Sequence, residues 1–170
     1  GLFIVLLVIW LVFSLIQSRF YSVINVFGII RQASTMGIMG IALAGVMING
    51  DFDMSIAATA SLVGVLQITF VMMGWNPYLI FIIGILTGLI IGAINAFLVV
   101  KVNIPAFIAT MGMMIFLRGL AKYITGGAEI YPLEMPTFFS LFGSEYIFGV
   151  IPTSTLTFFI LSVVAILFYE

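Results

Sequence analysis

Two long apolar runs flank a short acidic segment in the first third of the chain. The runs Ala33 to Ile48 and Met54 to Gly74 carry no charged side chain, and Asp51 and Asp53 lie between them. A bilayer core of about 30 Å needs roughly 20 apolar residues in a helix, and backbone groups in hydrocarbon must bond to one another. The pattern therefore predicts two membrane helices, separated either by an aqueous turn or by a polar break within the membrane.

The composition of the whole chain also points to a membrane protein. Of 170 residues, 64% are hydrophobic and only 6% are charged, whereas soluble domains carry about 25% charged residues. The net charge of −1 argues against a nucleic-acid partner. Cysteine and histidine are both absent, which excludes disulfides, thiol catalysis and the usual zinc sites. The chain also lacks a phosphate-binding loop. We therefore expect no metal site and no cofactor in this chain.

We predict an all-α integral membrane protein, a polytopic bundle with about six transmembrane helices in one domain. The chain begins at Gly1, and we expect it to be part of a longer protein. Residues 18–32 are either an interfacial segment or a loop followed by the start of the next helix. Residues 128–155 contain three glutamates and three prolines and are predicted to be a loop in water, with a short element at 146–151. The predicted spans are 2–17, 33–48, 54–74, 79–100, 105–125 and 156–169.

The fourth predicted span carries a series of small residues at helical spacing. Gly84, Gly88 and Gly92 stand four residues apart and share one helix face. Such a face allows another backbone to approach closely. It serves either plain helix packing or a helix that lines a substrate path, and Asn95 lies near its edge.

Three charged residues within or between the spans are functional candidates. Asp51 and Asp53 either lie in water at a turn or belong to a break where helix ends meet a substrate or a coupling ion. Asp51 or Ser55 is also suited to cap the third helix. Arg118 lies deeper in the fifth span than Lys122, and it either pairs with an acid or contacts substrate.

Two stretches resemble the membrane permeases of ribose-type ABC sugar importers. Ile30 to Ser55 resembles a stretch that ends in Gly-Gly-Ile-Asp-Leu-Ser-Val-Gly in that family, although Asp51 and Phe52 replace its glycine and isoleucine, and Ala57-Ala58 stand where Gly-Ser is usual. A second block is similar almost position by position. It comprises Gly92-Ala93-Ile94-Asn95-Ala96, Ile104 to Met114, Arg118-Gly119-Leu120 and Thr125-Gly126-Gly127.

The resemblance implies a permease of about ten helices in the bacterial plasma (inner) membrane, without catalytic activity of its own. It implies a second permease copy or a related permease, cytoplasmic ATP-binding subunits that hydrolyse the ATP, and an extracytoplasmic sugar-binding protein. It places Asp51 to Asp53 and Lys101 toward the cytoplasm and residues 128–155 outside. The loop that couples such a permease to its ATPase is expected beyond Glu170.

We expect the spans to form the translocation path for a monosaccharide or a similar polyhydroxylated solute. An alternative is an ion-coupled secondary transporter that uses Asp51 and Asp53. An intramembrane enzyme would need an acid on a second helix, and no other predicted span carries one. A purely structural subunit would leave the charged break unexplained. The polar candidates for the path are Asn49, Asp53, Ser55, Gln67, Asn95 and Thr110.

Overall fold

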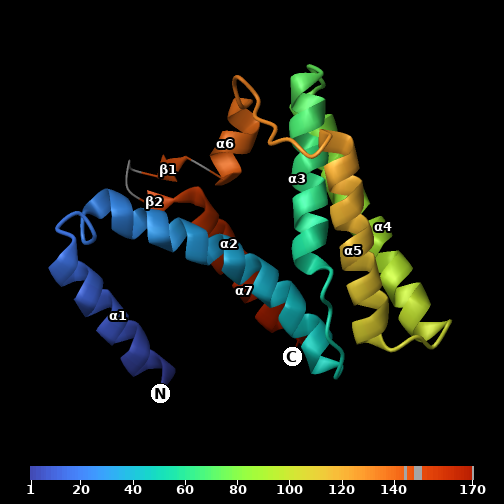
Figure 1. The fold of residues 1–170 in the computed structure, drawn as a ribbon, viewed down its shortest axis with the longest axis horizontal. Coiled ribbons are helices and arrows are strands. Elements are labelled where there is room, and N and C mark those ends of the chain that lie inside the picture. Colours follow the sequence, from blue (N-terminus) through green and yellow to red (C-terminus); the bar gives the residue numbers. More distant parts are fainter. Residues whose placement is uncertain (144, 148–150, 170) are drawn as a thin grey trace.

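The computed structural model describes residues 1–143, 145–147 and 151–169, which form seven helices and one small hairpin (Figure 1). In chain order the elements are α1 (Leu2–Ile16), α2 (Val23–Ile48), α3 (Ile56–Met72), α4 (Pro77–Val100), α5 (Ala106–Thr125), α6 (Thr137–Gly143), β1 (Tyr146–Ile147), β2 (Ile151–Pro152) and α7 (Thr153–Tyr169). The hairpin strands pair antiparallel. The fold is thus all-α apart from this hairpin.

Helices α3, α4 and α5 pack together as one bundle (Figure 1). Its core is small and consists of Ala58, Leu62, Ile91, Leu117 and Ala121. Most large apolar side chains point outward instead and are exposed. Such a surface is unfavourable in water and favourable in lipid or against other membrane helices.

Helices α2 and α7 form a second packed pair beside this bundle. A Cβ atom added at Gly37 of α2 would lie 2.5 Å from Cε2 of Phe158 on α7, and one added at Gly45 would collide with the hydroxyl of Tyr169. The Ser34 hydroxyl lies 3.0 Å from that of Thr155 across the same contact. Small residues on α2 therefore allow aromatic side chains of α7 to lie directly on its backbone.

Within the described part of the chain, three helices are long and apolar enough to cross a membrane, namely α2, α4 and α5. Helices α1, α3 and α7 are apolar but shorter. The 17 residues of α3 extend about 25 Å at 1.5 Å per residue, slightly less than the hydrocarbon thickness of about 30 Å. Helix α3 by itself is therefore slightly shorter than a full membrane span.

The helix boundaries differ from the predicted spans by more than two residues at two places and by at most two residues elsewhere. Helix α2 is continuous from Val23, where Ser22 caps it by accepting a hydrogen bond from the Asn25 amide at 3.3 Å. This agrees with the second interpretation of residues 18–32, a loop followed by the start of the next helix. Helix α7 begins at Thr153, three residues before the start of the predicted span at 156.

The predicted loop at 128–155 contains more structure than expected. Helix α6 lies within it, and its Phe138 ring packs against Tyr78 and Phe81 of α4 with centroid distances of 4.8 and 5.6 Å. The short element expected at 146–151 corresponds to the hairpin, although residues 148–150 lie outside the described part of the chain.

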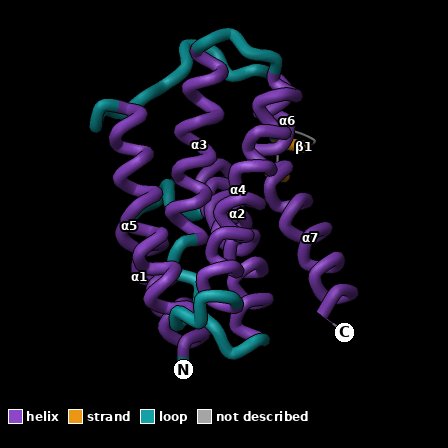
Figure 2. Tube along the Cα trace, turned by 90° about the vertical axis from the view of Figure 1, so that its right-hand side faces the viewer, coloured by secondary structure: helices purple, strands orange, loops and turns teal. Residues whose placement is uncertain are grey.

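The connections divide between the two ends of the α3–α5 bundle. The segment between α2 and α3 lies at the same end as the connection between α4 and α5, and the segment after α5 lies at the opposite end (Figures 1 and 2). The family resemblance implied this relative arrangement of Asp51 to Asp53, Lys101 and 128–155. Which end faces the cytoplasm stays a prediction.

Candidate functional site

The segment between α2 and α3 leaves the helical conformation for about seven residues. Helix α2 ends at Ile48, and Gly50 turns the chain with a positive φ of 82°, which glycine adopts without a Cβ clash. Helix α3 begins at Ile56 with Ser55 in the N-cap position. The Asn49 and Gly50 amides still bond to carbonyls in the last turn of α2, whereas the amides of Met54 and Ser55 have no helical partner among the described residues.

Asp53 supplies one of the missing partners. Its Oδ1 accepts hydrogen bonds from the Ser55 backbone amide at 2.6 Å and from the Ser55 hydroxyl at 2.7 Å. Ser55 occupies the N-cap, but its side chain does not cap the helix. The carboxylate instead lies at the N-terminus of α3, where the helix dipole favours a negative charge.

Thr110 of α5 supplies a hydrogen-bond partner for the backbone amide of Met54. Its hydroxyl oxygen accepts a hydrogen bond from the Met54 amide at 3.1 Å and donates to the Ala106 carbonyl at 2.8 Å. The Phe52 carbonyl also lies 3.3 Å from this oxygen. Only 3% of Thr110 is exposed. The break is therefore fixed to α5 through a buried side chain.

Asn95 of α4 joins the same network from the other side. Its Nδ2 donates to the Ser55 hydroxyl at 2.9 Å, and only 6% of the residue is exposed. Its Oδ1 is buried and has no hydrogen-bond partner. Four predicted residues from three separate stretches thus meet at the break: Asp53, Ser55, Asn95 and Thr110.

A cleft of about 160 Å³ opens beside this network, between the start of α3 and one face of α4. It is lined by Asp53, Ser55, Ile56, Thr59, Gly88, Ile91, Gly92 and Asn95. A Cβ added at Gly88 or Gly92 would meet nothing within 4 Å. These two glycines therefore leave space at the cleft and do not serve a helix contact within this chain.

Gly84 differs from the other two glycines. A Cβ at Gly84 would lie 2.6 Å from Nε2 of Gln67 and 3.2 Å from Cγ1 of Val63. The glycine series thus divides into one position that packs against α3 and two that line the cleft. Gln67 lies at the packing position and is not part of the cleft.

The remaining predicted residues lie apart from the network. Asn49 is the C-cap of α2, and its side chain donates to the Gly45 carbonyl at 3.2 Å. Asp51 and Arg118 are exposed, and neither lines the cleft. Sequence reasoning missed Thr59, whose hydroxyl donates to the Ser55 carbonyl at 3.0 Å. Its position one helical turn after Ser55 is the signal that indicates it.

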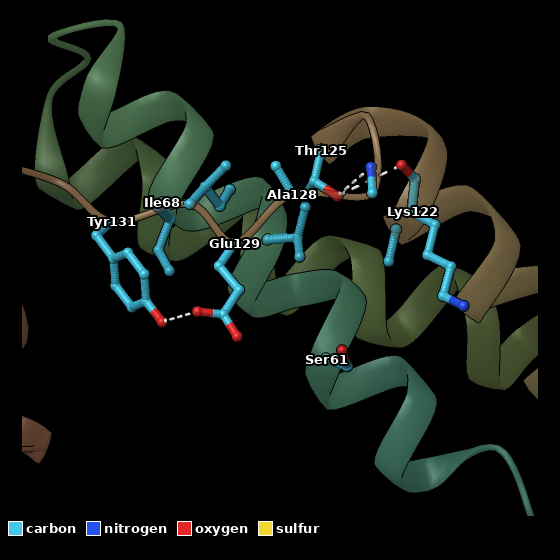
Figure 3. Close-up of a pocket in the computed structure, with 11 residues that line it drawn as sticks. Ser61, Ile68, Lys122, Thr125, Ala128, Glu129 and Tyr131 are labelled. Atoms are coloured by element: carbon cyan, nitrogen blue, oxygen red, sulfur yellow. Dashed lines mark hydrogen bonds between the residues drawn. The ribbon is translucent and has the colours of Figure 1, made fainter.

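A second groove, of about 380 Å³, lies toward the opposite end of the bundle (Figure 3). It is formed by α3, the end of α5 and the segment that follows, with Ser61, Lys122 and Glu129 among its residues. The Tyr131 hydroxyl donates to the Glu129 carboxylate at 2.5 Å. This bond raises the pKa of the Tyr131 phenol above its ordinary value, because the neutral phenol is the form that donates.

Comparison with known proteins gives one family and a consistent set of relatives. The family described as the permease component of branched-chain amino acid transport systems matches residues 25–170. No solved structure gives a significant match.

Three curated relatives are similar at about the same level. The chain is 29% identical over 150 residues to the ribose import permease protein RbsC of Haemophilus influenzae, covering 87% of this chain and 46% of the relative. It is 30% identical over 157 residues to RbsC of Bacillus subtilis, covering 92% and 47%. It is 31% identical over 140 residues to the xylose transport system permease protein XylH of Escherichia coli, covering 82% and 34%. The chain thus spans less than half the length of these relatives.

Proposed function

This chain belongs to the permease-component family that matches residues 25–170, and we propose that it forms part of the solute path of an ATP-driven importer. The proposed cargo is a monosaccharide or a similar polyhydroxylated solute. The names of the relatives, a ribose and a xylose permease, support this class. The helices would alternate between outward-open and inward-open states, with ATP binding on other subunits shifting the balance.

The observation that carries the proposal is the hydrogen-bonded network at the break before α3. Asp53, Ser55 and Asn95 bring polar groups from two helices to one cleft inside an otherwise apolar bundle. Polar groups buried within an apolar bundle of membrane helices are functional candidates, because their burial is costly. Transporters build their binding sites at similar discontinuities of membrane helices.

The chemistry of the cleft favours a sugar over an amino acid. A zwitterionic amino acid carries a carboxylate, which needs a cationic side chain or a free helix N-terminus, and the Asp53 carboxylate already lies at the N-terminus of α3. None of the described residues that line the cleft is basic, whereas Asp53 and Asn95 offer oxygen atoms. A neutral solute with several hydroxyl groups matches such a lining, although the family description mentions branched-chain amino acids.

We further propose the partners that such an importer requires. These are a second copy of the permease or a related permease, two cytoplasmic ATP-binding subunits, and an extracytoplasmic protein that delivers the sugar. ATP hydrolysis would take place on the ATP-binding subunits.

The test is uptake of radiolabelled ribose and xylose by cells that express the full-length permease with its partner subunits. Asp53→Ala removes the acceptor for both Ser55 groups and is expected to abolish uptake, while expression and membrane insertion persist. Asp51→Ala is the matched control, because Asp51 is exposed and outside the cleft, and it should retain uptake. Normal uptake by Asp53→Ala would remove this residue from the site.

The same assay separates the importer from an ion-coupled transporter. Uptake by the importer should stop when ATP is depleted and should persist when the sodium and proton gradients are collapsed. The opposite pattern would support an ion-coupled transporter that uses Asp51 and Asp53.

A further inference from the structure

Two buried side-chain polar atoms in the described part of the chain have no hydrogen-bond partner, Ser154 Oγ and Asn95 Oδ1. Of the two, only Asn95 Oδ1 belongs to a residue that lines the cleft. Buried acceptors of this kind are rare, because leaving one unpaired is costly. We propose that Asn95 Oδ1 accepts a hydrogen bond from a hydroxyl group of the permeating sugar. This assignment rests on the proposed import function.

The direction of each hydrogen bond in the network explains why the free atom is an acceptor. An ionised Asp53 carboxylate can only accept hydrogen bonds. The Ser55 hydroxyl therefore donates its single hydrogen bond to Asp53, at 2.7 Å. Ser55 must then accept from its other neighbour, and the Asn95 amide nitrogen faces it at 2.9 Å. The opposite amide orientation would place two acceptors against each other. The charge of Asp53 thus fixes the orientation of Asn95 through Ser55.

The other side chains of the cleft leave few donors for a solute. The Thr59 hydroxyl donates its hydrogen bond to the Ser55 carbonyl at 3.0 Å, and the Ser55 hydroxyl donates its hydrogen bond to Asp53. The acceptors that remain on the lining residues are the Asp53 carboxylate and Asn95 Oδ1, and the second Nδ2 proton of Asn95 is the remaining donor. A solute that donates several hydrogen bonds fits this lining, and each sugar hydroxyl is such a donor.

The cleft also has room for part of a sugar. Its volume of about 160 Å³ corresponds to about five water molecules at ~30 Å³ each. Because neither Gly88 nor Gly92 projects a side chain, a ring can approach the backbone of α4 directly. Asn95 follows Gly92 by three residues, so its amide lies at one end of the surface that the glycines leave open.

The test uses a cysteine placed in the cleft of the full-length permease. The chain contains no cysteine, and any outside this part can be replaced by serine. Gly92→Cys is a suitable reporter, because its Cβ meets nothing within 4 Å. Gly112→Cys on α5 is the matched control, since its Cβ also meets nothing and Gly112 does not line the cleft. The rate of alkylation by a hydrophilic maleimide is measured against the concentration of whichever sugar, ribose or xylose, the complex imports.

The sugar should slow labelling at Gly92→Cys and leave labelling at Gly112→Cys unchanged. Adding Asn95→Leu should raise the sugar concentration needed for half protection by about three- to tenfold, the effect of losing one neutral hydrogen bond. One singly deoxygenated analogue of the sugar should show a similar loss in the Asn95 protein and no further loss in the Asn95→Leu protein. The analogue comparison in the Asn95 protein requires no change at Asn95, so it remains decisive if Asn95→Leu does not fold.

Other results would overturn the assignment. These are an unchanged half-protection concentration in Asn95→Leu, equal potency of the sugar and every deoxygenated analogue, or protection by Na⁺ in place of sugar. Failure to label Gly92→Cys would mean that the cleft is sealed, which also excludes the assignment. If the complex imports the sugar, any of these results refutes the role of Asn95 alone. If it imports no monosaccharide, the proposed function fails and this assignment fails with it.

Discussion

Thr110→Val tests whether the break before α3 is fixed by side chains of neighbouring helices. Valine has nearly the shape of threonine but cannot accept the hydrogen bond that the Met54 amide makes to Thr110 at 3.1 Å. An unpaired buried donor costs about 1–3 kcal/mol. Because the Met54 bond is only partly buried, we expect a loss of about 1–2 kcal/mol in the free energy of unfolding.

Thr87→Val is the matched control for this change. The Thr87 hydroxyl makes the same type of bond to the carbonyl four residues earlier, at 2.8 Å, as Thr110 makes to Ala106. This local bond adds little to helix stability, so Thr87→Val should change the free energy of unfolding by less than about 0.5 kcal/mol. The difference between the unfolding free energies of the two variants therefore measures the hydrogen bond between Thr110 and the Met54 amide.

The measurement is unfolding of each purified full-length variant in mixed micelles of increasing SDS fraction. Equal unfolding free energies for Thr110→Val and Thr87→Val would refute the reasoning. In that case the bond to Thr110 would not hold the break, and the conformation of residues 49–55 would need another cause.

Two further predictions concern contacts away from the cleft. Gly37→Ala should weaken the contact between α2 and α7 by about 1–3 kcal/mol through overpacking, because its Cβ would lie 2.5 Å from the Phe158 ring. Gly40→Ala meets nothing within 4 Å and should show no such loss in the same SDS unfolding assay. Glu129→Gln should lower the pKa of Tyr131, because the carboxylate that stabilises the neutral phenol is removed. Absorbance at the phenolate band during an alkaline titration measures this, with Tyr131→Phe subtracted, and an unchanged titration would contradict the assigned cause.

Much of the candidate site could be predicted from the sequence, because polar residues are rare in apolar runs and must find partners there. Asp53, Ser55, Asn95 and Thr110 follow from this rule, and the structure brings them together. Gln67 obeys the same rule but lies 12 residues after Ser55, about 18 Å further along α3. Its distance from the cleft is therefore a consequence of helical rise.

The remaining differences depend on contacts that no local pattern reveals. Helix α6 follows Pro136 in a segment rich in glutamate and proline, so the local signals indicate a loop. The contacts of Phe138 with Tyr78 and Phe81 link it to α4. Those partners are more than 50 residues away in sequence. The division of the glycine series likewise depends on which glycine faces Gln67.

Some side chains of the network at the break stabilise its backbone, and others are free for function. The two kinds differ in whether they bond to a backbone group of the break. Outside a helix in an apolar environment, each backbone group needs a partner. The Thr110 hydroxyl accepts a hydrogen bond from the Met54 amide, and the Asp53 carboxylate accepts one from the Ser55 amide. These two side chains would therefore be needed at this break even in a protein that transports nothing. Asn95 pairs with no backbone group of the break, and it brings to the cleft an acceptor that the fold leaves unused. Transport is consequently expected to fall more than stability at Asn95, which donates one buried hydrogen bond to Ser55, whereas Thr110 should affect both.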